Sequence, residues 1–150
     1  MLVMTISAMA QKTMSTQELS DRMELRALVD RYAVESDKGN QDAYREIFVK
    51  NLNLRLYTGD NVMEFHDVDE MVKAYKAGGK AKVSFHQTGE QYLEYYDGTH
   101  ATGIVYLTAL LVDDKDVPTH LYIRYNDKYE KIDGHWWITD RDQHILYMEH

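Results

Sequence analysis

Tyr32 lies in a predicted helix and Asp37 lies at its end, five residues further on, so the pair supplies a phenol and a carboxyl group that can donate and accept protons. Five residues turn a helix through about 500°, which leaves the two side chains roughly 140° apart. They converge only if the helix unwinds near Ser36, and Gly39 and Asn40 favour such an ending. Taken singly, Tyr32 is more simply a core aromatic residue and Asp37 a helix-end residue.

His86 lies in a strand-like run, so Ser84, His86, Thr88 and Glu90 are expected to share one face. An imidazole changes protonation near neutral pH, and a histidine facing a closed pocket therefore suits a general base or acid. From the bare sequence, a hydrogen-bonded core or surface histidine is the simpler interpretation.

The other histidines lack the spacing of a metal site such as HExxH. The sequence also contains no Gly-rich phosphate loop and no G-x-S-x-G nucleophile motif. It therefore predicts neither a metal site nor a cofactor. The histidines concerned are His66, His100, His120, His135, His144 and His150.

Charge and composition narrow the range of partners. The formal net charge is −8 at pH 7, which argues against a nucleic acid and an anionic membrane surface. Cysteine is absent, which excludes disulfides and thiolate chemistry. With 150 residues, 44% hydrophobic and 28% charged, the chain is expected to form one globular domain. No segment approaches the roughly 18 apolar residues of a membrane span.

The N-terminus, residues 1–19, is predicted to be a leader or a flexible segment, with the domain spanning residues 20–150. Ala8-Met9-Ala10 followed by Gln11 looks like a signal-peptidase site. The apolar run before it is short and contains no Lys or Arg. A cytoplasmic protein is therefore expected, and export is the alternative.

Helices are predicted in the first half of the chain. Apolar residues recur at helical spacing behind the capping residues Ser15 or Ser20, and Gly78-Gly79 ends the last helical segment. A strictly alternating segment between the helices predicts a strand over residues 51–57. The predicted helices span residues 21–36, 41–48 and 67–77.

Four long segments rich in Tyr, Ile, Thr and Val follow, separated by turns such as Asp97-Gly98 and Asp133-Gly134. Helices followed by an antiparallel meander indicate one α+β domain. Long strands packed on helices must curve around them, so the concave side holds side chains or a ligand. The predicted strands span residues 83–95, 101–112, 119–132 and 136–147.

Four stretches of the chain resemble the SnoaL-like branch of the nuclear-transport-factor-2-like superfamily, which includes scytalone dehydratase and the bile-acid 7α-dehydratase. The resemblance covers about residues 20–150. It implies a cone-shaped, curved antiparallel sheet packed on N-terminal helices. The stretches are 31–39, with a tyrosine followed five residues later by an aspartate, 83–87 around a pocket histidine, 102–107, and 125–136, the most specific.

The resemblance implies a cofactor-independent lyase (a dehydratase), or an isomerase or cyclase, acting on a hydroxylated polycyclic or aromatic carbonyl compound. His86 is then the base, Asp37 orients and charge-balances it, and Tyr32 donates to the departing or developing oxygen. The partner is expected to be a small hydrophobic substrate. The predicted substrate-binding residues are Tyr57, Tyr106, His120 and Tyr125.

Three positions depart from the family pattern. Ala109 replaces an aspartate, Ile145 an arginine and Leu111 a second pocket histidine. Because supporting polar groups are missing, the alternative is a protein that binds a small hydrophobic ligand on the same fold without reacting. The separation of His86 and Asp37 in three dimensions discriminates between the two functions.

A homo-oligomer, either a trimer or a dimer, is expected because long strands leave one sheet face to cover. His120, Tyr122, Arg124 and Asn126 share a strand face and either line the pocket or form a subunit interface. Related dehydratases form trimers and other relatives form dimers. The aromatic residues suited to an interface are Tyr92, Tyr106, Tyr122, Tyr129 and Trp137.

Overall fold

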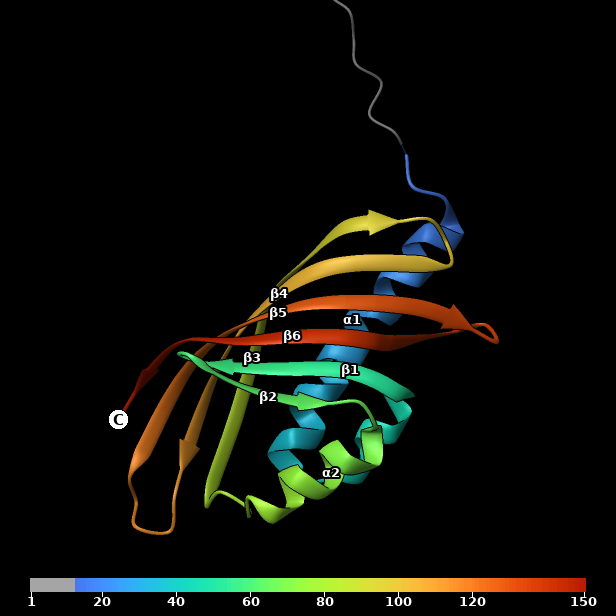
Figure 1. Ribbon diagram of the computed structural model, residues 1–150. Coiled ribbons are helices and arrows are strands. Elements are labelled where there is room, and N and C mark those ends of the chain that lie inside the picture. The colour runs from blue at the N-terminus through green and yellow to red at the C-terminus, as the bar shows by residue number, and fades with distance from the viewer. Residues whose placement is uncertain (1–12) are drawn as a thin grey trace, which may run out of the picture.

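The computed structural model describes residues 13–150, so the segment that looks like a signal-peptidase site lies outside the described residues. The first element is the long helix α1 (Thr16–Lys38), which lies against the concave side of the sheet (Figure 1). The Ser15 side chain caps it by accepting the N–H of Glu18 at 3.0 Å. The predicted first helix is therefore confirmed, and it begins within the predicted leader.

The C-terminal end of α1 differs from the expectation. The helix is continuous through Asp37 and Lys38, so unwinding near Ser36 was wrongly expected. Gly39 ends the helix with φ of 70°, in the left-handed region that glycine adopts without strain. The regular helix keeps Tyr32 and Asp37 directed to different neighbours.

A 3-10 helix and a hairpin follow α1. The 3-10 helix η1 (Gln41–Glu46) replaces the predicted second α-helix, because the chain is already in strand β1 (Phe48–Thr58) at Phe48. Strand β1 pairs with β2 (Asn61–Phe65), which the sequence analysis did not predict. The tight turn at Gly59, whose φ is 58°, joins the two strands.

Helix α2 (Val68–Ala77) confirms the third predicted helix, and the Asp67 carboxylate caps its first N–H groups. Four long strands then complete the chain, close to their predicted bounds. They are β3 (Val83–Tyr96), β4 (His100–Val112), β5 (Pro118–Ile132) and β6 (His135–Glu149).

The six strands form one sheet in the order β2-β1-β6-β5-β4-β3. The meander β3 to β6 is antiparallel, as predicted, but β1 runs parallel to β6. The sheet is therefore mixed and not purely antiparallel. The parallel pair arises because the last strand of the meander lies beside the first strand of the chain, a neighbour that no local pattern reveals.

The sheet wraps around α1 in a curve that does not close (Figure 1). Register shifts in the β3–β4 pair between Thr88 and Gln91 and between Leu93 and Tyr95 help it to bend. Gly103 of β4 permits the backbone of β3 to approach closely there, since a Cβ at this position would lie 2.8 Å from the Tyr92 carbonyl oxygen. The first shift also moves the Glu90 side chain off the inner face.

The core occupies the space between α1 and the concave face. Leu25 and Val29 of α1 are fully buried there with Ile138 of β6. Tyr129 is also buried, with 1% of its surface exposed, so its predicted place in a subunit interface is wrong. The inner face of a strand, once covered by a helix, offers no surface to a partner. No helix within residues 13–150 is long and apolar enough to cross a membrane.

Candidate functional site

A cavity of about 230 Å³ lies between the helices and the concave face of the sheet. Tyr32 and Ser36 of α1, Tyr44 of η1 and Tyr75 of α2 contribute one side of it. The sheet contributes polar residues and apolar residues to the other side. These sheet residues are Ser84, His86, Leu111, Leu121, Ile123, Tyr125 and Gln143.

His86 and Asp37 meet at this cavity. His86 Nδ1 lies 2.6 Å from Asp37 Oδ1, and the His86 backbone N–H donates to Asp37 Oδ2 at 3.0 Å. Ser84 Oγ also donates to Asp37 Oδ1 at 3.0 Å. The His86 side chain is 14% exposed and the Asp37 side chain is 26% exposed. Three hydrogen bonds hold the carboxylate, and the carboxylate in turn holds Nδ1 of the ring, which leaves Nε2 as the other ring nitrogen available for chemistry.

Tyr32 lines the cavity separately from the His86–Asp37 pair. Its ring packs edge-on against Phe48 and Tyr125 and tilted against Tyr44, with centroid distances of 5.7, 6.1 and 4.8 Å. Burial raises the pKa of Tyr32, which keeps its hydroxyl protonated at neutral pH. The phenol is therefore a fixed hydrogen-bond donor beside the cavity.

A buried ion pair packs against the rings of Tyr32 and Tyr125. Arg141 donates to Asp127 through Nε and Nη2 at 2.8 and 2.7 Å, and both side chains are fully buried. The guanidinium carbon lies 3.8 Å from the ring centroid of Tyr125 and 4.7 Å from that of Tyr32. Burial opposes the charge of Arg141, but the Asp127 carboxylate outweighs it and raises the pKa of Arg141. The pair thus positions two aromatic rings of the cavity.

Tyr44 is a further fixed ring. Its hydroxyl lies 2.7 Å from Ser36 Oγ, which donates to the Tyr32 carbonyl oxygen at 2.6 Å. Burial raises the pKa of Tyr44 as well. The tyrosine-rich wall therefore presents neutral phenols to the cavity.

The four predicted substrate-binding residues separate into two groups. Tyr125 lines the cavity. Tyr106 and His120 are exposed on the outer face of the sheet, and Tyr57 stacks there on His144 at a ring distance of 4.5 Å. Their expected position inside the cone is therefore corrected. Side chains alternate across a strand, and these three residues occupy the positions opposite the inner ones.

Glu90 also leaves the predicted face. The shift between Thr88 and Gln91 places Gln91 inside, where it donates to the Leu25 carbonyl oxygen at 3.2 Å. Glu90 borders a hollow on the outer face with Tyr106. A bulge cannot be predicted from alternation alone, so only Ser84, His86 and Thr88 keep their common face.

The three positions that depart from the family pattern are all apolar, and one of them, Leu111, lines the cavity. Ala109 is buried and pairs directly with His86 across β3 and β4. Ile145 packs against the core beside Ile123. The apolar part of the sheet side of the cavity thus comes from Leu111, Leu121 and Ile123.

Sequence reasoning missed several polar residues of the site. They are Ser84 as a partner of Asp37, and Gln41, Tyr44, Tyr75, Lys80 and Gln143 as lining residues. Gln143 carries a usable signal, because it alternates with Arg141 and Ile145 on the inner face of β6. Tyr44 and Tyr75 come from separate short helices, and no local spacing relates them.

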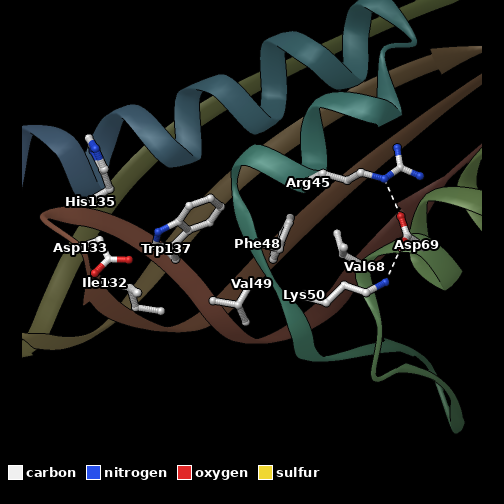
Figure 2. A pocket seen from close by; sticks show the side chains of 10 residues that line it. All are labelled: Arg45, Phe48, Val49, Lys50, Val68, Asp69, Ile132, Asp133, His135 and Trp137. Atoms are coloured by element: carbon white, nitrogen blue, oxygen red, sulfur yellow. Dashed lines mark hydrogen bonds and ion pairs between the residues drawn. The ribbon is translucent and has the colours of Figure 1, made fainter.

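A larger hollow of about 590 Å³ lies elsewhere, near the β5–β6 turn (Figure 2). Phe48, Val68 and Trp137 give it an apolar lining, and Arg45 and Lys50 converge on Asp69 at its edge. Its cations are neutralised by carboxylates, and it lacks a base held by an orienting group. Within residues 13–150, no cluster of three or more His, Cys, Asp or Glu side chains could hold a metal ion.

The chain belongs to the SnoaL-like domain family, which matches residues 17–142. A scytalone dehydratase-like protein of Novosphingobium aromaticivorans has a similar structure, with TM-score 0.80, 17% identity and 91% of each chain covered. So does Kfla4162 of Kribbella flavida, with TM-score 0.77, 19% identity and coverage of 87% of this chain and 94% of that chain.

A third similar structure is the hexachlorocyclohexane dehydrochlorinase LinA-type3 of Novosphingobium barchaimii. Its TM-score is 0.73 at 16% identity, with 89% of this chain and 91% of that chain covered. At these identities the likeness shows the fold, and the function must be argued from the site.

Proposed function

We propose that this protein is a cofactor-independent lyase or isomerase that removes a proton from a carbon next to a carbonyl group. The observation that carries the proposal is the 2.6 Å contact between His86 Nδ1 and Asp37 Oδ1 at the cavity. With Nδ1 engaged by the carboxylate, Nε2 of His86 is the base. Asp37 stabilises the imidazolium that forms when the proton arrives.

In the elimination, His86 Nε2 takes the proton from the carbon, and the electron pair of the broken C–H bond forms the new C=C bond. The hydroxyl on the neighbouring carbon leaves with its bonding electrons and takes the proton from the His86 imidazolium, so the products are an enone and water and His86 returns to the neutral imidazole. Tyr32 donates a hydrogen bond to the oxygen on which charge develops. Its raised pKa suits this donor role, because the phenol is neutral before the reaction.

Cavity size and lining narrow the substrate class. A volume of about 230 Å³ lies below the range of about 300–1,000 Å³ typical of drug-sized ligands. Leu111, Leu121 and Ile123 give the sheet side of the cavity an apolar surface. The sequence analysis expected a polycyclic or aromatic carbonyl compound, and within that class these features favour a substrate with one or two rings.

The comparisons lend support of a different kind. One similar structure is a dehydrochlorinase and another is scytalone dehydratase-like, and each of those names denotes an elimination reaction. A base that removes a proton while a neighbouring group leaves serves both reactions. The His86–Asp37 pair supplies such a base here.

The test is turnover of cyclic β-hydroxy ketones, beginning with 3-hydroxycyclohexanone and extending to two-ring analogues. Elimination of water gives an enone, whose ultraviolet absorption reports the rate. Wild-type protein is expected to accelerate the reaction for at least one member. Turnover that persists unchanged in His86→Ala would contradict the assignment.

A non-catalytic ligand-binding protein is the second candidate, and Ala109 and Ile145 favour it. Both are apolar where related dehydratases have polar groups, so neither position extends a polar side chain toward the cavity. Binding of the ketone panel without elimination, measured by calorimetry, would support this candidate over the lyase.

We also propose a homo-oligomer, a trimer or a dimer, formed through the outer face of the sheet. The exposed fractions of Tyr92, Tyr106 and Tyr122 are 69%, 45% and 44%. Tyr122 and Tyr147 lie with ring centroids 5.9 Å apart on that face. Sedimentation should show an oligomer at micromolar concentration, and Tyr106→Lys should dissociate it while the circular dichroism spectrum is retained. A wild-type monomer would refute this part.

A further inference from the structure

Two residues that line the cavity each have one buried polar atom without a hydrogen-bond partner among the described residues. The atoms are Tyr75 Oη and Gln143 Oε1. A buried polar group without a partner destabilises the folded protein, so such groups are rare and call for an explanation. Both residues line the same cavity, so a ligand that binds there can supply the missing partners.

Gln143 occupies a position that is otherwise suited to an apolar residue. It lies on the inner face of β6, between Leu56 of β1 and Tyr125 of β5 in the sheet. Only 8% of its surface is exposed. An amide here offers one acceptor and two donors toward the cavity. The helical side of the cavity adds the Tyr75 hydroxyl.

Tyr75 complements this amide. Burial raises the pKa of Tyr75 well above its ordinary value, so the hydroxyl is protonated and able to donate. Its ring is held by Tyr44 and Phe65 at centroid distances of 6.0 and 6.1 Å. Three other buried polar atoms without partners lie outside the cavity lining: Arg124 Nε, Trp136 Nε1 and Arg141 Nη1.

We propose that Gln143 and Tyr75 are specificity-determining residues that bind a second polar group of the substrate, distant from the carbon attacked by His86. This inference rests on the proposed function and names the substrate class more closely. The substrate is a one- or two-ring ketone with an additional hydroxyl group. Neither residue takes part in proton transfer.

The sheet register separates the two parts of the cavity. His86 lies in the row of Ala109 and Leu121, whereas Gln143 lies in the row of Tyr125, four residues further along β5. Strands β4 and β5 lie between the strands that carry His86 and Gln143. A ligand that contacts both groups must span the cavity, so its two oxygens lie at opposite ends of the ring system.

The test compares two probes, 1-indanone and 5-hydroxy-1-indanone, whose ketone is the same and whose added hydroxyl lies at the far end of the bicycle. Calorimetry is expected to show that wild-type protein binds the hydroxylated probe roughly 3- to 10-fold more tightly, as one neutral hydrogen bond provides. Gln143→Met has nearly the same length without the amide and should abolish the preference. Tyr75→Phe should reduce it.

Two controls separate the possible failures. The melting temperature of ligand-free Gln143→Met should equal or exceed that of the wild type, because no protein hydrogen bond of the amide oxygen is lost. His86→Ala should retain the preference for 5-hydroxy-1-indanone while losing elimination of β-hydroxy ketones. If that preference exists but no ketone turns over, the subsite stands and the proposed function fails.

Three results would overturn the subsite. They are equal binding of the two probes by wild-type protein, a preference that survives in Gln143→Met, and no binding of either probe at millimolar concentration. A large loss of melting temperature in both Gln143→Met and Tyr75→Phe would indicate structural roles and would also overturn it.

Discussion

Two of the three aspartates in helix α1, Asp21 and Asp37, are bonded to the sheet in similar ways but lie in different surroundings. Asp21 accepts hydrogen bonds from Lys131 at 2.7 Å, from Tyr96 at 2.6 Å and from Gln17 at 3.0 Å. Asp37, four turns further along, also accepts three hydrogen bonds, two of them from His86. The number of hydrogen bonds does not distinguish a structural carboxylate from a chemical one.

The two carboxylates differ in the residue that each binds and in whether that residue reaches the cavity. Asp21 is fully buried, and Lys131 gives it a cation that also lies 5.8 Å from the Trp136 ring centroid. None of the partners of Asp21 lines the cavity, whereas His86 does. A lysine stays charged at neutral pH, but an imidazole exchanges its proton there. The same residue type on one helix therefore serves stability at one end and supports chemistry at the other.

The largest expected effect is on the histidine. His86→Ala removes the proposed general base, so turnover of a β-hydroxy ketone should fall by roughly 10²–10⁴-fold. Melting temperature should change little, because the side chain borders a cavity. His144→Ala, on the outer face, is the control and should keep wild-type turnover. A His144→Ala enzyme as impaired as His86→Ala would break the link between the cavity and the reaction.

The next effect contrasts the two aspartates directly. Asp21→Asn leaves Lys131 beside a neutral amide in a buried site and should cost about 3 kcal/mol of unfolding free energy. For a chain of this size that lowers the melting temperature by roughly 6–12 °C. Asp37→Asn should lose most turnover with a smaller change in melting temperature. Thermal unfolding and the enone assay measure both variants, and equal destabilisation would erase the proposed difference.

The stabilising effect of Asp21 should depend on pH. Burial of Asp21 disfavours its charge, but the hydrogen bonds from Lys131 and Tyr96 outweigh this and lower its pKa in the folded protein well below the ordinary value. Its contribution to stability is therefore complete above the unfolded pKa of about 3.9 and declines as pH falls below that value. The melting-temperature gap between wild type and Asp21→Asn should be wide at pH 7 and narrower at pH 2.5. A constant gap would contradict the shift.

The smallest effect is expected at Tyr32. Tyr32→Phe removes one hydrogen-bond donor and keeps the ring packed over Arg141. Turnover should fall by about tenfold, as loss of one such bond to a developing charge implies. Binding of 1-indanone should be unchanged, because the apolar contacts remain. Calorimetry that shows weakened binding with unchanged turnover would assign Tyr32 to ground-state binding.

The chain itself determined its elements and the first members of the site. Helical spacing and capping residues located α1 and α2, and alternation with turn residues located β3 to β6 within a few residues. These are local properties, set by side-chain period and backbone preference. The resemblance of short motifs selected Tyr32, Asp37 and His86, and the structure brings His86 and Asp37 into contact.

Only the tertiary structure decided which strand lies beside which and which face each side chain occupies. The parallel pairing of β1 with β6 joins residues that lie far apart in the sequence, such as Phe48 and Ile138, and the bulge after Thr88 reverses the face of Glu90. Tyr75 and Gln143 share a cavity although 68 positions of numbering separate them. Such contacts depend on packing among distant segments, and a residue-by-residue pattern carries no information about them.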